Sequence, residues 1–277
     1  MNNLIKYRQW LKSKILQPST IRVYCTIIKP YQEQQLTTAN LGKIIQQGLP
    51  KYQPSYLILK REVLKSYSQF KKQGAINWEK MSQFIPLVQR KFFATINEGE
   101  LAKLKEVRFE RDPTIYHRNN LILDFLFYSG IRVSELTNLK HSDWEDNHLR
   151  VLGKGNKLRY VFLPEFLISQ INPYSRNYLF LNSQGQPLTT EYIVRLIRKR
   201  TLLAVIKKKV TPHTFRRSFA TLLNSKGARL TTIQKLLGHS NLETTASYIH
   251  NSWEELYWDY SRLWQNSPLQ ENYEKKN

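Results

Sequence analysis

Cysteine and acidic residues are scarce in this sequence, and long apolar runs are absent from it. The single cysteine, Cys25, excludes an internal disulfide and a cysteine-rich zinc site. No apolar run approaches the roughly 18 residues that a membrane-spanning helix needs, so no membrane partner is expected. The N-terminal segment MNNLIKYRQWLKSK alternates charged with apolar residues and lacks the apolar centre of a signal peptide. We therefore expect a cytoplasmic protein.

The shortage of acidic residues leaves a strongly basic chain. Lys and Arg number 43 against 21 Asp and Glu, a formal net charge of +22. Such a surface attracts polyanions, and counterion release makes nucleic acid the natural partner. The excess is densest in residues 1–93, which hold 16 basic and three acidic residues. Charge alone leaves an RNA-binding protein of ribosomal type, or simply a basic protein, as open alternatives.

Hydrophobic periodicity predicts a helical domain over residues 1–90. Apolar residues recur at helical spacing after Pro18, after Thr38 (the expected helix cap) and after Pro54, and again from Trp78 to Ile85. Basic residues lie mostly off the apolar stripe that follows Pro54, and few acidic residues balance them. We therefore expect this domain to contact DNA phosphates, although a solvated basic helix face is the plainer alternative.

The second part, residues 94–277, is predicted to be mostly helical with a small antiparallel sheet. The fold class is thus mainly α, of the α+β type. The predicted elements are helices over Asn97–Val107 and Tyr116–Tyr128, strands over His148–Leu152, Leu158–Leu163 and Tyr178–Leu181, and helices from Thr189 onward. The turn-rich sequence GKGNK joins the first two strands as a hairpin.

Four short segments of the second part carry residues suited to attack on a phosphodiester. They are SGIRVSEL with Arg132, GKGNK with Lys154 and Lys157, PHTFRRSFAT with His213 and Arg216, and LGHS with His239, which Tyr248 follows nine residues later. Each segment alone has a plainer explanation. Arg132 suits a salt bridge at a helix start, His213 suits a cap or a core position, and Tyr248 is one of 16 tyrosines.

Together these residues supply what phosphodiester cleavage without a metal requires. Two guanidiniums can hold the phosphate oxygens through paired hydrogen bonds. A tyrosine hydroxyl is a nucleophile that leaves a reversible ester. A lysine can protonate the departing oxygen, and histidines can donate hydrogen bonds or move protons. We therefore expect no metal and no cofactor.

In order and spacing, these segments resemble the catalytic motifs of the tyrosine recombinase, or phage integrase, family, and its Xer-like members in particular. The resemblance covers about residues 94–250, and the helical N-terminal part resembles that family's SAM-like core-binding domain. It departs at Arg217, where many relatives have histidine, a position without a catalytic role.

The resemblance implies a role for each matching residue. Arg132 and Arg216 would hold the scissile phosphate, and His239 would donate a hydrogen bond to it. His213 would assist proton movement. Tyr248 would be the nucleophile. Lys154 would be the general acid, with Lys157 as the alternative.

The resemblance also implies a site-specific recombinase acting on double-stranded DNA through a 3′-phosphotyrosyl intermediate and a Holliday junction. It would work as a homotetramer, or as a heterotetramer with a second recombinase, using an exchange helix at the C-terminus of the catalytic domain, 94–277. Resolution by a Xer-like enzyme and integration or excision of a mobile element stay open. A type IB topoisomerase and an inactive DNA-binding relative are the alternatives.

Overall fold

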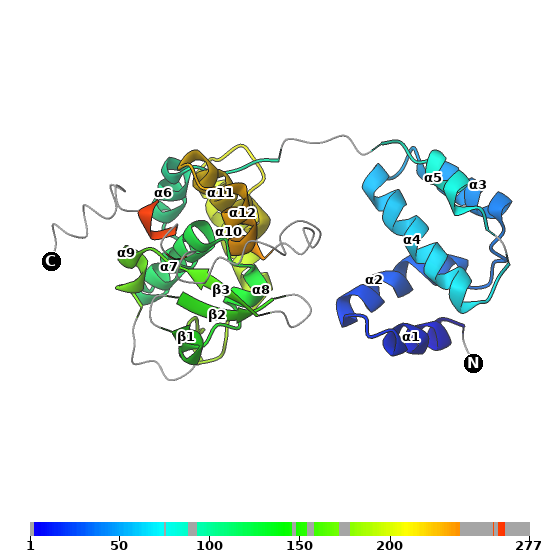
Figure 1. Cartoon of the computed structure of the whole chain (residues 1–277). Coiled ribbons are helices and arrows are strands. Elements are labelled where there is room, and N and C mark those ends of the chain that lie inside the picture. The colour runs from blue at the N-terminus through cyan, green and yellow to red at the C-terminus, as the bar shows by residue number, and fades with distance from the viewer. Residues whose placement is uncertain are drawn as a thin grey trace. The chain divides into compact units, whose positions relative to one another are not determined.

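The computed structural model of the chain divides into two compact units, Met1–Lys91 and Phe92–Asn277 (Figure 1). The residues described are 3–74, 76–87, 93–145, 148–153, 158–171, 178–238, 257 and 260–263. Within these ranges every helix is too short or too polar to span a bilayer.

The first unit is entirely helical in its described part. Its elements are α1 (Asn3–Ser13), α2 (Pro18–Ile28), a 3₁₀ turn (Lys29–Tyr31), α3 (Thr38–Gly48), α4 (Pro54–Phe70) and α5 (Trp78–Gln83). Helix α4 contacts all four other helices (Figure 1). Its buried residues Leu57, Val63, Leu64 and Tyr67 recur at helical spacing, as in an amphipathic helix that packs one face on the core.

Two details of this unit differ from the sequence prediction. Helix α1 was not predicted, because its charged residues obscure an apolar stripe of which Tyr7 and Leu11 are the buried members. Thr38 was predicted as the cap of α3, but the cap is Thr37, whose hydroxyl accepts a hydrogen bond from the Asn40 amide at 3.2 Å.

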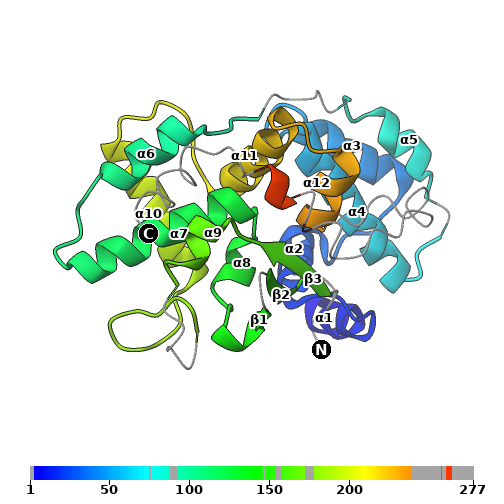
Figure 2. The same ribbon diagram turned by 60° about the vertical axis from the view of Figure 1, so that its left-hand side comes forward.

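The second unit combines helices with one small sheet, so the predicted fold class is confirmed. Its helices are α6 (Glu98–Glu106), α7 (Pro113–Ser129), α8 (Val133–Leu136), α9 (Glu165–Ile168), α10 (Thr190–Leu203), α11 (Pro212–Ser225) and α12 (Leu230–Leu237), with a 3₁₀ turn at His141–Asp143. Helix α7 is buried over most of its last two turns, and α11 packs on both α7 and α12 (Figures 1 and 2).

The sheet is antiparallel, with the order β1 (Trp144–Glu145), β2 (His148–Leu152) and β3 (Leu158–Phe162). The prediction of a third strand at Tyr178–Leu181 is wrong. That segment makes only two isolated bridges, from Tyr178 to Lys140 and from Leu181 to Pro187. Its apolar run exists because Phe180 is buried in the core against Phe125, and a core position requires no strand partner.

Candidate active site

The first candidate segment starts where α7 ends. Gly130 terminates α7 in the left-handed conformation, with φ of 59°. A Cβ atom at this position would lie 2.4 Å from Cδ1 of Phe219, so both the backbone angle and the packing require glycine. The tight turn exposes the Gly130 carbonyl to α11 and places Arg132 immediately before α8.

Arg216 lies in the second turn of α11, which Thr211 caps and Pro212 opens. Its side chain is buried, and its Nη1 donates to the Gly130 carbonyl at 2.6 Å. Its Nη2 donates to the carbonyl of Leu237, the last residue of α12. Both acceptors are main-chain carbonyls, and Arg216 forms no ion pair with a carboxylate in the described part of the chain.

Arg132 also binds the C-terminal end of α12. Its Nη2 donates to the Gly238 carbonyl at 3.3 Å, one residue beyond the carbonyl that Arg216 binds. Its Nη1 donates to Oε1 of Glu135 at 2.7 Å. The two predicted phosphate-binding arginines are therefore brought together at the C-terminal end of α12.

Glu135 is shared with a third arginine, Arg159 of β3. Arg159 Nη2 donates to Oε2 of Glu135 at 2.6 Å, and its Nη1 donates to the Leu236 carbonyl at 2.6 Å. Glu135 Oε2 also accepts the Arg132 backbone amide at 3.0 Å. One buried carboxylate thus neutralises part of a cluster of three guanidiniums.

Burial and mutual repulsion shape the electrostatics of this arginine cluster. Burial, followed by repulsion from Arg132 and Arg159, lowers the pKa of Arg216 to about 9, and attraction to Glu135 opposes this shift only in part. Arg159 also has a lowered pKa, because burial outweighs its attraction to Glu135. Burial alone would raise the pKa of Glu135, but its hydrogen bonds and attraction to Arg159, and its bonds to Arg132, lower it. Three guanidiniums share one carboxylate, so the cluster favours an anion.

The other predicted site residues are placed as follows. His213 lies in the first turn of α11, three residues before Arg216, and its side chain is exposed. Lys154, its alternative Lys157, His239 and Tyr248 lie outside the described residues.

Arg217, where the sequence departs from the family pattern, contacts an aromatic ring. Its side chain is exposed, and its guanidinium lies over the ring of Phe93, 3.9 Å from the ring centre. This cation–π contact holds the start of the second unit's chain against α11.

Two buried arginines were missed from the sequence, and each had a detectable signal. Arg159 occupies an inward position of β3, in phase with buried Val161 and opposite buried Val151. Arg200 continues the apolar stripe of α10 at the spacing of Ile193 and Ile197. A charged residue in phase with core residues indicates a buried ion, and that signal was available in both segments.

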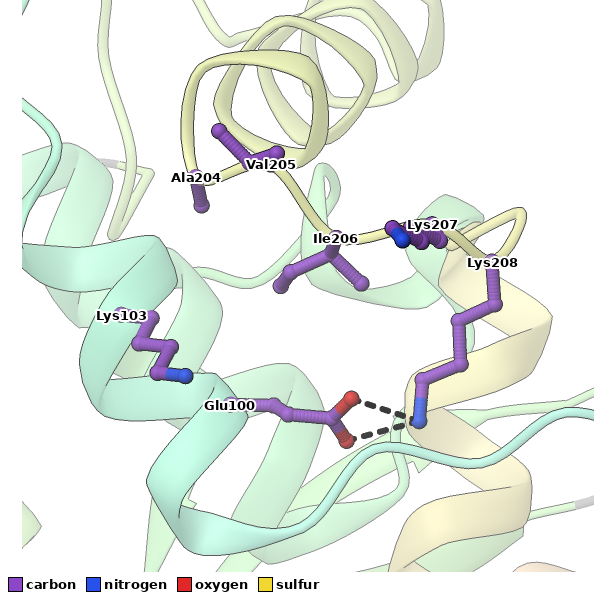
Figure 3. Close-up of a pocket in the computed structure, with 7 residues that line it drawn as sticks. All are labelled: Glu100, Lys103, Ala204, Val205, Ile206, Lys207 and Lys208. Atoms are coloured by element: carbon purple, nitrogen blue, oxygen red, sulfur yellow. Dashed lines mark hydrogen bonds and ion pairs between the residues drawn. The ribbon is translucent and has the colours of Figure 1, made fainter.

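Elsewhere in the second unit, an open pocket of about 360 Å³ lies between α6 and the segment that follows α10 (Figure 3). Glu100 and Lys208 pair across it at 2.7 Å, with Lys103, Lys207 and the apolar residues Ala204–Ile206 as further lining. The ion pair ties the chain just before α11 to the start of α6. None of the predicted catalytic residues lines this pocket, and the described residues contain no cluster of potential metal ligands.

The described residues near the C-terminus pack on their own unit. Tyr260 is buried and donates a hydrogen bond to the Tyr128 carbonyl at 2.9 Å. Tyr257 and Tyr260 both contact the ring of Phe162. This part of the chain therefore supports the last turn of α7, next to Gly130.

Comparison with known proteins adds independent information. The model of the phage integrase family matches residues 98–255. Tyrosine recombinase XerD of Chlorobaculum tepidum is 35% identical over 191 residues, which cover 63% of this chain and 60% of that protein. Tyrosine recombinase XerD of Staphylococcus haemolyticus is 30% identical over 280 residues, which cover 90% of this chain and 94% of that protein.

Two solved structures share the fold. The XerH site-specific recombinase bound to a palindromic difH substrate, in a post-cleavage complex, matches with a TM-score of 0.68 and 22% identity, covering 91% of this chain and 80% of that one. A lambda integrase (75–356) dimer bound to a COC′ core site matches with a TM-score of 0.69 and 18% identity, covering 86% of this chain and 90% of that one.

Proposed function

Because this chain belongs to the phage integrase family and is a tyrosine recombinase, an enzyme that cleaves and rejoins DNA at specific sites, we propose that Arg132 and Arg216 bind the scissile phosphate. The observation that carries this proposal is the incomplete compensation of the Arg216 charge. Its guanidinium is buried and, among the described residues, is bonded only to the carbonyls of Gly130 and Leu237. Glu135 attracts it but bonds to Arg132 and Arg159 instead. A buried cation without a bonded counter-ion is costly, and a bound phosphate would supply one.

In the proposed reaction, the Tyr248 hydroxyl attacks the phosphorus atom. The new bond joins the tyrosine oxygen to phosphorus, and the bond to the 5′-oxygen breaks, leaving a 3′-phosphotyrosyl link and a free 5′-hydroxyl. The negative charge that spreads over the phosphate oxygens in the transition state is stabilised by the two guanidiniums. One preorganised donor of this kind typically contributes about 10²–10³ in rate.

Proton transfers complete each step of the proposed reaction. Lys154 gives its proton to the departing 5′-oxygen, with Lys157 of the same turn as the alternative donor. His239 donates a hydrogen bond to the phosphate. His213 is exposed one turn before the buried Arg216, a position that suits proton exchange near the nucleophile. Attack by a 5′-hydroxyl on the phosphotyrosine reverses the chemistry, so the bond energy is conserved.

The wider assembly follows from the relatives and is part of the proposal. We infer that residues 1–90 form a DNA-binding domain and residues 94–277 the catalytic domain with a C-terminal exchange helix. A lambda integrase tetramer on a Holliday junction supports a tetramer on duplex DNA as the active form. The tyrosine recombinases XerD among the relatives favour Xer-like recombination over relaxation by a type IB topoisomerase. We also infer, from the sequence alone, that the protein acts in the cytoplasm.

Covalent capture from a library of random sequences tests the proposed chemistry and finds the DNA site in the same experiment. The protein is incubated with a library of duplexes of random sequence, each carrying a nick that prevents religation after cleavage. Protein–DNA complexes that survive denaturing gels are recovered, and their DNA is sequenced. We expect the wild-type chain to capture a defined sequence, and Tyr248→Phe to bind the selected duplex without a covalent adduct. An adduct that persists in Tyr248→Phe would contradict the assignment of the nucleophile, and no adduct from the wild type would contradict the activity.

A further inference from the structure

Three successive carbonyls at the end of α12 each accept from a different arginine. The Leu236 carbonyl accepts from Arg159, the Leu237 carbonyl from Arg216 and the Gly238 carbonyl from Arg132. The last carbonyls of a helix lack partners within the helix and carry the negative end of its dipole. The end of α12 therefore binds three guanidiniums, although their residues come from β3, from α11 and from the turn before α8.

Arg159 differs from the other two arginines in what it can reach. It is buried in the sheet, opposite Val151 in the β2–β3 register, and its two terminal nitrogens are used by Leu236 and Glu135. A Cβ atom at Gly238 would lie 2.7 Å from Cδ of Arg159, so the arginine stem packs directly against the turn that ends α12. Arg159 thus supports the arginine cluster from its buried side.

The charge of Glu135 is divided between two arginines. Oε1 binds the Arg132 guanidinium at 2.7 Å, and Oε2 binds the Arg159 guanidinium at 2.6 Å. Without Arg159, the Glu135 carboxylate would pair with Arg132 alone, and the net charge of that pair would be close to zero. Three guanidiniums against one carboxylate instead leave an excess of positive charge for an anion.

From this geometry we propose that Arg159 is a positioning residue for strand cleavage. It draws the charge of Glu135 away from Arg132, and it holds the last carbonyls of α12 so that Arg132 and Arg216 face one phosphate. The inference rests on the proposed phosphate site of Arg132 and Arg216, and it adds a residue that touches neither the DNA nor the reacting atoms.

A double-mutant cycle separates this role from general support of the fold. The variants are Arg159→Gln, Glu135→Gln and the two together, with the rate of covalent complex formation measured at saturating DNA beside the thermal midpoint. We expect Arg159→Gln to slow cleavage by about 10–100-fold, because a small displacement of the phosphate-binding groups costs rates of this order. Adding Glu135→Gln should restore part of that loss, since no carboxylate then neutralises Arg132.

The controls assign each outcome. If Arg159→Gln cleaves within about twofold of wild type while folded, or if the double variant is no faster than Arg159→Gln, the inference is overturned. Should Arg159→Gln fail to fold, Arg159→Lys tests the positioning part of the proposal, because its single ammonium keeps a charge beside Glu135 but cannot reproduce the two separate bonds to Glu135 and the Leu236 carbonyl. Cleavage by Arg159→Lys should then be slower than by wild type, and a normal rate would overturn the inference. Normal cleavage by Arg216→Gln would instead overturn the proposed function, which keeps the two failures distinct.

Discussion

Arg200 and Arg216 are both buried arginines of the second unit, yet their surroundings differ in one respect. Arg200 is 0% exposed and pairs with Glu110 at 3.0 Å, and it also donates to the Asn120 side chain and the Leu104 carbonyl. Arg216 is 8% exposed and bonds only to two main-chain carbonyls. The first charge is paired with a carboxylate within the fold. The second is bonded only to dipoles, and it is attracted without a bond by Glu135, which Arg132 and Arg159 already bind.

This difference separates a structural ion from a functional one. A buried cation with its own carboxylate contributes to the integrity of the core, and removing it leaves the partner unpaired. A buried cation without one keeps a positive potential for a ligand, at a cost to stability. Arg200 should therefore matter for folding, and Arg216 for catalysis.

The largest expected effect is on stability, at Arg200. Replacing Arg200 with Met leaves Glu110 buried and unpaired, which should lower the free energy of unfolding by about 3–5 kcal/mol. Urea unfolding measures the loss. Arg198→Met, on the exposed face of the same helix, is the matched control, and its free energy of unfolding should change by less than about 0.5 kcal/mol. Protein that remains folded should cleave DNA normally. A stable Arg200→Met variant with impaired cleavage would reverse the comparison.

Arg216→Gln should show the opposite pattern. Loss of the guanidinium should slow covalent complex formation by about 10²–10³-fold. The free energy of unfolding should change by less than about 1 kcal/mol, because relief of the buried charge offsets the hydrogen bonds lost to Gly130 and Leu237. Both quantities can be measured on one preparation. A large loss of stability with normal cleavage of the folded fraction would place Arg216 in the same class as Arg200.

Gly130→Ala tests whether the carbonyl that holds Arg216 needs its present position. The new Cβ would collide with Phe219 in a left-handed backbone, so we expect a loss of about 1–3 kcal/mol together with slower cleavage. Gly185→Ala is the matched control, because Gly185 also has a positive φ, of 73°, but has open space around it. Its stability loss should be smaller, and its cleavage rate unchanged. Equal effects on cleavage at both positions would contradict the role given to Gly130.

The smallest expected effect is in the pH dependence of stability. Glu110 has a lowered pKa: burial would raise it, but hydrogen bonds from Asn119 and Arg200 outweigh burial. Its contribution to stability is therefore present above the unfolded pKa and is lost as the pH falls through the lower, folded value. Unfolding free energies measured across the acid range should fall less steeply in Arg200→Met than in wild type. Arg216→Gln leaves the Glu110–Arg200 pair intact and should flatten the acid limb less than Arg200→Met does. Equal flattening in the two variants would show that Arg216 depends on a carboxylate as much as Arg200 does.

The sequence predicted the parts of this molecule that depend on local patterns. The mainly α fold with a small sheet and the helix that carries His213 and Arg216 follow from periodicity and helix-start residues. The two-residue strand β1 was missed, because two residues show no alternation, and the strand predicted at Tyr178–Leu181 is wrong because burial of Phe180 imitates a strand pattern.

The arrangement of the site was predictable only in part. The family resemblance predicted that Arg132 and Arg216 lie close together. In the structure they bind neighbouring carbonyls at the end of α12. The place of Arg159 depends on β3 lying against the end of α12, a long-range contact that no local pattern encodes. The catalytic roles of all six residues stay predictions: Arg132, Lys154, His213, Arg216, His239 and Tyr248.

The most direct test of the central claim is the charge of the scissile phosphate itself. A cleavable duplex is prepared with either an ordinary phosphodiester or an uncharged methylphosphonate at the scissile position, and wild type is compared with Arg216→Gln on both. If the unpaired guanidinium serves the phosphate charge, the rate ratio should fall from about 10²–10³ on the phosphodiester to below about tenfold on the methylphosphonate. An equal ratio on both duplexes would contradict the account, because Arg216 would then act without regard to the phosphate charge.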